Sequence, residues 1–343
     1  MVLKSIKRKY LLGALLFLGP NLFSQENFDI KNYLVLGVET AEDLASLYLE
    51  PLSEGLLYGL TGAWNNTAQV KKPWEFTIGI VANGSFVPNE KLFKELDISS
   101  IENLEVLDGS TSVKIPTILG DEESEVTFVA TLNDEEFVFD APTGIGLFST
   151  NLLPNAFIQA SLGLPLHSEF SLRFFPKIEV SGANLGIIGF GLKHELTRSI
   201  TALENLPLSF SLFAAFTRLD ADYSFQADGF VTGASQQVDI YLNSWNVEAI
   251  LSTKFPVWNV YSGLGYVNGD SNYALLGTYT IVTAQETLNF TDPFDVQGQI
   301  SGLRGSLGGS VELNRFKINL DYTFQGFNNL ALGIHYNIIR SKK

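Results

Sequence analysis

Strict alternation of apolar and polar residues, repeated over segments of about ten residues, is the feature that most constrains this 343-residue chain. In the clearest segment Phe316, Ile318, Leu320, Tyr322 and Phe324 alternate with Lys317, Asn319, Asp321 and Thr323. Successive side chains of a strand point to opposite faces, so the segment predicts a strand with one apolar and one polar face.

Two architectures contain such strands: a soluble sandwich with its apolar faces packed inward, and a membrane barrel with its apolar face toward lipid. Sandwich strands more often have about five or six residues, whereas a tilted membrane span needs about ten. Short connections such as 254–257 alternate with long ones such as 220–238 and 268–297. Aromatic residues lie near the segment ends, as in interfacial girdles: Trp74, Phe86, Trp258, Tyr266, Phe316, Phe324 and Tyr336. These features favour an all-β, antiparallel up-and-down outer-membrane barrel with its short turns in the periplasm.

Ten strands are clear in the sequence, and residues 272–290 add either a further hairpin or an extracellular extension. The clear spans are 74–87, 155–164, 168–179, 184–196, 207–218, 239–253, 257–267, 299–313, 316–325 and 329–339. We therefore predict a barrel over residues 74–343 with about 12 strands, in a range of about 10 to 14. An even number places both ends of the barrel in the periplasm.

Residues 1–24 have the pattern of a secretory signal peptide, with four basic residues before the apolar stretch Leu11–Leu18 and the small Ser24 at the cleavage point. A retained anchor is the weaker interpretation, because Pro20 interrupts the stretch well short of the ~20 residues that span a bilayer. Cleavage takes the net charge from −15 to −19. The expected location is the outer membrane, reached by signal-directed export.

The rest of the composition excludes several classes of protein. No later run of about 18 apolar residues occurs, which excludes a helical membrane protein. The chain has no cysteine, which excludes disulfides and thiolate chemistry. Its acidic charge repels phosphates, so we expect no nucleic-acid partner.

Residues 25–73 do not alternate as strands do, and we predict a periplasmic segment that enters the barrel mouth. Thr40 and Asp43 resemble a helix start, and Pro51 ends the helical pattern. The following glycine-rich stretch is either a hatch that plugs the lumen or a periplasmic lead into the first strand. The candidate hatch residues are Leu60, Trp64, Asn65, Asn66 and Thr67.

Residues 89–143 contain fourteen acids and three lysines, a net charge of −11. Charges at this density must be solvated, so we predict a long surface loop. A gate or a divalent-cation site is the alternative, since carboxylate oxygens suit hard cations.

Two motifs resemble known proteins. The segment Leu60–Ala68 followed by strand 74–87, with the exit Phe86–Asn89 and the signal end Phe23–Gln25, is similar to the start of an uncharacterised outer-membrane barrel family of Bacteroidota. That family loosely resembles the FadL/TodX class of hydrophobic-compound channels, which implies a hatch and passage of a small hydrophobic solute. Gly333, Tyr336 and Ile338 resemble the C-terminal signal that the barrel-assembly machinery recognises, which implies that machinery as a partner.

No pattern indicates catalysis. His167, His194 and His335 have no neighbouring histidine at metal-ligand spacing, and the common nucleophile and phosphate-binding motifs do not occur. We therefore expect no catalytic residues, no metal, no cofactor and no enzymatic activity. The charged residues on the polar strand faces are candidates for the lumen wall: Arg173, Lys193, Glu248, Arg304, Glu312, Lys317 and Asp321. Their mixed signs suggest ion pairs between neighbouring strands.

The predicted function is passive passage of small hydrophobic molecules through a plugged barrel, with outer-membrane lipid around it. A non-conducting structural or surface-interaction barrel is the alternative, and an outer-membrane hydrolase is a weaker one.

Overall fold

The computed structural model describes residues 29–146, 151–180, 183–200, 203, 206–226 and 229–339. The predicted signal peptide, residues 1–24, lies outside the described residues.

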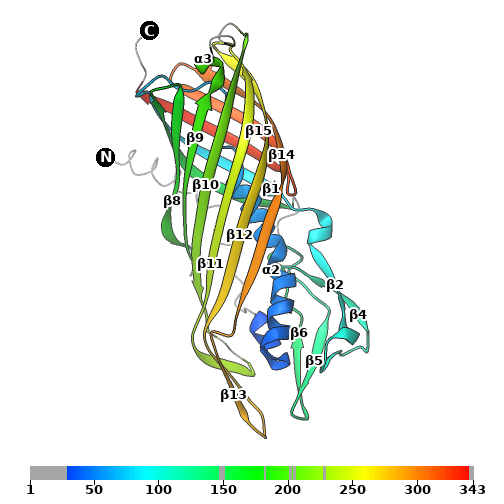
Figure 1. Cartoon of the computed structure of the whole chain (residues 1–343). Coiled ribbons are helices and arrows are strands. Elements are labelled where there is room, and N and C mark those ends of the chain that lie inside the picture. The colour runs from blue at the N-terminus through cyan, green and yellow to red at the C-terminus, as the bar shows by residue number, and fades with distance from the viewer. Residues whose placement is uncertain are drawn as a thin grey trace, which may run out of the picture.

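A closed antiparallel barrel of ten strands forms the body of the molecule (Figure 1). Each strand pairs with the next along the chain, and the last pairs with the first. The strands are β1 (Phe76–Phe86), β7 (Leu152–Leu164), β8 (Ser168–Val180), β9 (Ala183–Glu195), β10 (Leu208–Ser224), β11 (Val231–Thr253), β12 (Trp258–Val282), β14 (Phe294–Leu313), β15 (Phe316–Phe324) and β16 (Asn329–Ile339). The predicted barrel is confirmed, and its strands correspond to the ten clear spans.

The ten strands lie within the predicted range of about 10 to 14, at its lower end, and are two fewer than the expected 12. Residues 272–282 lengthen β12, and β13 (Thr287–Thr291) pairs only with the end of β12, outside the closed ring. The additional hairpin is therefore an extension of the wall and not two further barrel strands.

The barrel wall is apolar outside and polar inside. On β12 and β14 the outward Leu264 and Leu303 are 68% and 77% exposed, whereas the inward Arg304 is 3% exposed. An apolar outer wall around a polar interior is the arrangement of membrane barrels and the opposite of a soluble sandwich.

This polarity reverses at one level of the wall. On β11 the outward residues change from Trp245 to Asn243, while the inward residues change from Ser244 to the buried Leu242. The same outward change separates Phe216 from Arg218 on β10, and Leu303 from Ser301 on β14. Beyond this level the strands continue with an apolar inner face. The stretches 220–238 and 268–297, which we predicted as polar loops, are therefore mostly strand, because their apolar residues cover a second core.

That second core contains the N-terminal helices and an insertion between β1 and β7. The helices are η2 (Asp29–Leu36) and α2 (Val38–Thr61). The insertion comprises η3 (Asn89–Lys91), β2 (Phe93–Asp97), η4 (Ile98–Ser100), β3 (Leu104–Val106), β4 (Ser112–Pro116), β5 (Thr127–Leu132) and β6 (Glu135–Asp140). Tyr33 of η2 contacts the rings of Phe128 and Phe139, at centroid distances of 6.3 and 6.0 Å.

The acidic segment 89–143 is thus a folded insertion of two small sheets, one pairing β2 with β4 and the other β5 with β3 and β6, and not an irregular loop. Apolar side chains at alternate positions, such as Phe128 and Phe137, supply its core. Its acids remain mostly at the surface.

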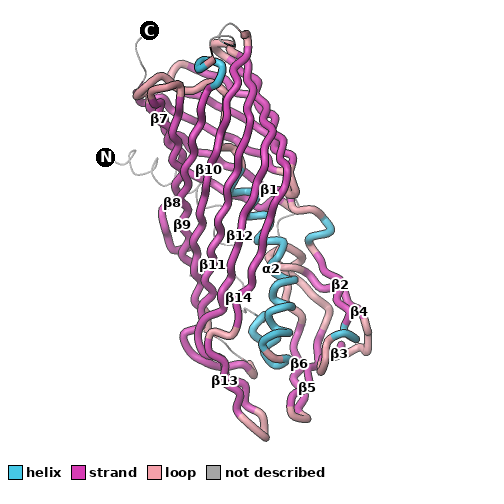
Figure 2. Tube along the Cα trace, in the orientation of Figure 1, coloured by secondary structure: helices cyan, strands magenta, loops and turns pink. Residues whose placement is uncertain are grey.

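The two ends of the barrel differ (Figure 2). One end, here called the turn end, carries the short connections 165–167, 254–257 and 314–315 and the short helix α3 (Leu196–Ser199). The opposite end, here called the domain end, carries η2, most of α2, the insertion and the extended parts of β10 to β14 (Figure 1). No helix in the described part of the chain is long and apolar enough to cross a membrane.

Candidate functional site

The chain before β1 runs through the barrel from the domain end to the turn end. Helix α2 enters the lumen, where its last turns contact β1, β7, β10, β11, β12 and β14. An irregular stretch then continues to the turn end, where the Trp74 amide donates to the Gly163 carbonyl at 2.8 Å and β1 begins. Residues 57–73 are called the threading segment below.

The helix continues through Pro51, where we predicted its end. Proline removes one amide donor and disfavours the preceding turn, yet packing can outweigh this local cost. Leu49 and Leu52 on either side are buried, and so is Leu57 further along. The contacts of α2 with the wall and the insertion thus keep it helical into the lumen.

Side chains of the wall donate hydrogen bonds to nearly every backbone carbonyl of the threading segment up to residue 68. The donors are Ser244 to Leu57, Asn83 to Gly59, Arg173 and Thr217 to Leu60, Arg304 to Thr61, Arg173 to Gly62, Gln159 to Trp64, Ser310 to Asn66, Lys193 to Thr67 and Ser211 to Ala68. A buried carbonyl without a donor is costly, so this wall stabilises the last turn of α2 and the irregular stretch that follows it inside the lumen. The recognition is directed at the main chain.

Arg173 is the central contact and is fully buried. Its Nη1 donates to the carbonyls of Leu60 (3.1 Å) and Gly62 (2.9 Å), and its Nε and Nη2 donate to Gln159 Oε1. The guanidinium lies 3.9 Å from the Trp64 ring centroid and 4.4 Å from that of Phe157. Acceptors and ring faces therefore surround most of the cation.

Arg173 and Arg304 also stand at the C-terminal end of α2. The last carbonyls of a helix lack intrahelical partners and carry the negative end of its dipole. Arg304 Nη1 donates to the Thr61 carbonyl at 2.8 Å. Two buried cations thus cap a helix end that has no basic residue of its own in its last turn.

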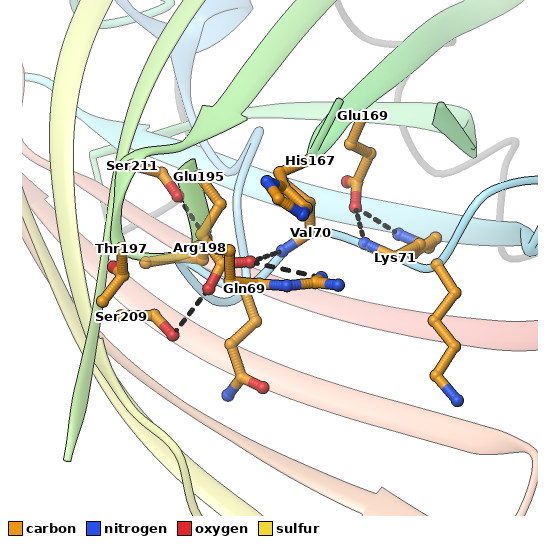
Figure 3. Close-up of polar contacts among 12 residues, drawn as sticks. Gln69, Val70, Lys71, His167, Glu169, Glu195, Thr197, Arg198, Ser209 and Ser211 are labelled. Carbon is orange, nitrogen blue, oxygen red and sulfur yellow. Dashed lines mark hydrogen bonds and ion pairs between the residues drawn. The ribbon is translucent and has the colours of Figure 1, made fainter. Parts of the chain in front are cut away.

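Acceptors of the wall bind the amides of the segment nearer the turn end. Ser252 Oγ accepts from the Ala68 amide (3.0 Å), Glu195 Oε2 from Val70 (3.0 Å) and Glu169 Oε2 from Lys71 (3.1 Å). Figure 3 shows the two carboxylates reaching the segment from the strand ends. Glu195 also accepts from Ser209, and Glu169 forms ion pairs with Lys71 (3.2 Å) and Lys193 (3.3 Å).

The structure places all five candidate hatch residues in the threading segment. Trp64 packs on Phe213 of the wall, with 5.8 Å between the ring centroids, and the Thr67 and Ser252 hydroxyl oxygens are 3.1 Å apart. Leu60 is fully buried, Asn65 reaches Glu248 at 3.5 Å, and the Asn66 carbonyl accepts from Ser310. Residues 29–56 lie at the domain end, opposite the short turns, whereas we predicted that this segment and the short turns share the periplasmic side.

The seven candidate lumen residues all lie on the inner face. Arg173, Lys193 and Arg304 bind the backbone of the threading segment, and Glu248 contacts Asn65 and Ser306. Asp321 accepts from the Tyr261 hydroxyl at 3.0 Å, while Glu312 and Lys317 line a cavity at the turn end. We expected these charges to pair between strands, but much of their bonding goes to the threaded chain.

Sequence reasoning missed Gln159, Glu169, Glu195, Ser211 and Ser252. Each occupies a polar-face position of a predicted strand, so the alternation alone placed it inside. Nothing in the sequence showed that a separate segment would lie within reach.

The cavity at the turn end has a volume of about 550 Å³ and lies between the threading segment and the wall. Charged residues line it on several sides, including Lys71, Lys193, Lys317, Glu169, Glu195 and Glu312. Its chemistry suits polar ligands more than apolar ones.

The candidate assembly-signal residues lie on β16. Tyr336 and Ile338 point outward and are 37% and 43% exposed, whereas Gly333 faces inward against Asn319. His167 and His194 lie near the turn end and share Ser199 as a hydrogen-bonding partner, and His335 bonds Asn319. Within the described part of the chain, no three potential metal ligands converge.

Ion pairs join α2 to the insertion at the domain end. Lys91 contacts Glu50 (3.3 Å) and Glu54 (2.8 Å), and Lys94 contacts Glu50 (2.5 Å). Partial burial opposes ionisation of Glu50, but Lys94 and Lys91 outweigh it and hold its pKa below the ordinary value. Burial likewise opposes the charge of Lys91, but Glu54 and Glu50 raise its pKa above the ordinary value.

The fold and the lumen define a class: a closed β-barrel whose interior is filled by the chain that precedes its first strand. The protein belongs to DUF6588, a family of unknown function, whose model matches residues 4–338. Comparison with curated proteins gave no match.

Three solved structures illustrate the likeness of fold. Ail, the attachment invasion locus protein of Yersinia pestis, is 10% identical, over 78% of this chain and 98% of that chain, with a TM-score of 0.26. The toluene transporter TbuX of Ralstonia pickettii is 6% identical over 80% and 92%, with a TM-score of 0.22. The transport unit of the autotransporter AIDA-I from Escherichia coli is 8% identical over 84% and 98%, with a TM-score of 0.29.

Proposed function

We propose that the protein is an outer-membrane barrel that holds a folded domain at the cell surface and is sealed by its own chain in the resting state. The apolar belt, bounded at one level by Trp245 and Tyr266 and at the turn end by Trp258 and Phe316, supports a membrane location. Short turns face the periplasm in such barrels, which places the domain end outside.

The sealed state is supported by the series of hydrogen bonds between the wall and the threading segment. A solute that passes along this part of the lumen must displace residues 57–71 from these donors and acceptors. Each broken buried contact leaves an unsatisfied polar group, at a cost of about 1–3 kcal/mol. A segment held by many such contacts stays in place without an external trigger.

Conductance in planar bilayers tests this proposal. We expect the wild-type barrel to stay closed and the double variant Arg173→Ala, Arg304→Ala to open frequently, because it removes both cations that donate to the carbonyls at the end of α2. Lys177→Ala, Arg218→Ala removes two cations that are paired with acids and exposed, and is the matched control. A difference in gel mobility between unheated and heated samples shows that a variant barrel is folded. An open wild type, or a folded double variant as closed as the control, would contradict the sealed state.

Passage of small solutes is a second candidate, supported by the 550 Å³ cavity beside the segment. Its charged lining favours polar solutes, and the hydrophobic solute implied by the FadL/TodX resemblance remains a prediction. The chain has no cysteine, so the double variant Thr67→Cys, Ser252→Cys introduces a single disulfide between the threading segment and the wall when it is oxidised. If uptake into liposomes requires the segment to move, it stops on oxidation and returns on reduction. Uptake that persists in the locked form excludes this route.

Two further expectations belong to the same proposal. The barrel-assembly machinery inserts the protein through β16, so Tyr336→Ala should lower the amount of folded barrel in cells more than Tyr241→Ala, which also alters an exposed tyrosine. We expect no enzymatic activity, and turnover of acyl esters or phospholipids by the purified protein would contradict that expectation.

A further inference from the structure

We infer that the barrel carries its own N-terminal segment across the membrane, so that residues 29–56 and the start of β1 lie on opposite sides. The inference rests on the proposed membrane location, but the crossing itself does not depend on which end faces outward.

The closed wall leaves only the lumen as a path between the two positions. β1 and β16 pair from Phe76 opposite Ile339 to Ser85 opposite Asn329, so the ring is sealed along the whole of β1. At the domain end Tyr48 Oη donates to the Thr143 carbonyl at 2.6 Å, which ties α2 to the insertion. At the turn end the Lys72 amide donates to Glu75 Oε2 at 3.1 Å, directly before β1.

The polarity of the outer wall locates the membrane between these contacts. The Leu57 carbonyl accepts from Ser244, which lies between the outward polar Asn243 and the outward Trp245. Leu57 therefore lies at the level where the apolar belt ends, and residues 29–56 lie beyond it. Val70 and Lys71 bind Glu195 and Glu169 near the opposite edge of the belt. The threading segment thus spans the thickness of the apolar belt.

The contacts also indicate the order of folding. Helix η2 packs against β5 and β6, and Glu50 and Glu54 in the middle of α2 pair with Lys91, and all of these partners follow the first barrel strand in sequence. These contacts form only after both parts have reached the domain end. The lumen wall meanwhile binds main-chain groups, which any extended sequence offers during passage. Small residues ease the fit, since a Cβ on Gly59 would lie 3.1 Å from Ser85 Oγ and closer still to Asn155.

Site-directed labelling tests the crossing in the full-length protein. Because the chain has no cysteine, each variant carries one thiol: Glu39→Cys in the first turn of α2, Leu107→Cys in the insertion and Leu166→Cys in a short turn. The three positions are exposed, Leu107 at 66% and Leu166 at 84%. A membrane-impermeant maleimide is applied to intact cells and then to permeabilised cells.

We expect Glu39→Cys and Leu107→Cys to be labelled fully on intact cells, and Leu166→Cys only after permeabilisation. The crossing is overturned if Glu39→Cys and Leu166→Cys are labelled under the same condition and Leu107→Cys under the other. Labelling of Leu166→Cys alone on intact cells keeps the crossing and overturns the proposed orientation. Labelling of all three on intact cells overturns the crossing.

Discussion

At the scale of single residues, Arg173 has the largest expected effect on stability. Arg173→Ala removes the donor of the Gly62 carbonyl and one of the two donors of the Leu60 carbonyl, together with the contacts with Trp64 and Phe157. We expect a loss of about 3 kcal/mol in the free energy of unfolding. Arg173→Lys should restore little, because an ammonium cannot bind two carbonyls and Gln159 in one plane. Urea unfolding in detergent, followed by tryptophan fluorescence, measures both variants.

The control for this prediction is Arg218→Ala. Arg218 is exposed at the surface and pairs with Asp220 at 2.7 Å. Its loss should change stability by about 0.5 kcal/mol or less. Equal effects at the two positions would mean that the lumen contacts contribute no more than surface ones.

The inward direction of Arg173 was predictable from the sequence, but its partners were not. Strand alternation assigns each residue to a face, and the polar face of 168–179 includes Arg173. The partner carbonyls belong to residues more than a hundred positions earlier, and backbone groups carry no sequence signal. The continuation of α2 past Pro51 was missed for a related reason, since tertiary packing overrides a local preference.

At the scale of elements, the contact between α2 and the insertion should depend on pH. The pKa of Glu50 is lowered on folding, so its contribution is complete above its ordinary value of 4.5 and is lost as the pH falls through the lower folded value. The pKa of Lys91 is raised above 10.5, so its contribution is complete below 10.5 and is lost as the pH rises through the folded value. The contact is strongest between these limits.

Hydrogen exchange of residues 89–97 at different pH values measures this dependence. Because the intrinsic rate of amide exchange itself falls on acidification, the protection relative to that rate is compared, and we expect lower protection below pH 4.5 than at neutral pH in the wild type. Glu50→Gln should exchange faster at neutral pH and change less on acidification, with a stability loss of about 0.5 kcal/mol because the pair is partly exposed. Glu39→Gln, an exposed change on the same helix, is the control. An unchanged acid response in Glu50→Gln would assign the effect to other carboxylates.

The sequence predicted the barrel strands better than the strand extensions. Within the belt the apolar residues face outward, and the alternation of Trp258 to Tyr266 is plain. Beyond it the same faces exchange polarity, as Leu242 replaces Ser244 on the inner side. Because of this exchange of polarity, no single face of these strands stays apolar along the whole strand. In the sequence each extension therefore resembles a loop of mixed apolar and polar residues. The inner core that explains it comes from α2 and the insertion.

At the scale of the whole molecule, the polarity exchange predicts where a charge is tolerated on the outer wall. Leu307 and Ser301 point outward on the same strand, β14, on opposite sides of the level at which the belt ends. Leu307→Arg places a charge within the belt and should cost about 2–4 kcal/mol, whereas Ser301→Arg should cost about 0–1 kcal/mol. Reversible unfolding in lipid vesicles measures the difference, and mixed micelles with looser packing should reduce it. Equal costs for the two arginines would mean that the apolar belt does not end between Leu303 and Ser301, and the level that we assign to Leu57 at the mouth of the lumen would be wrong with it.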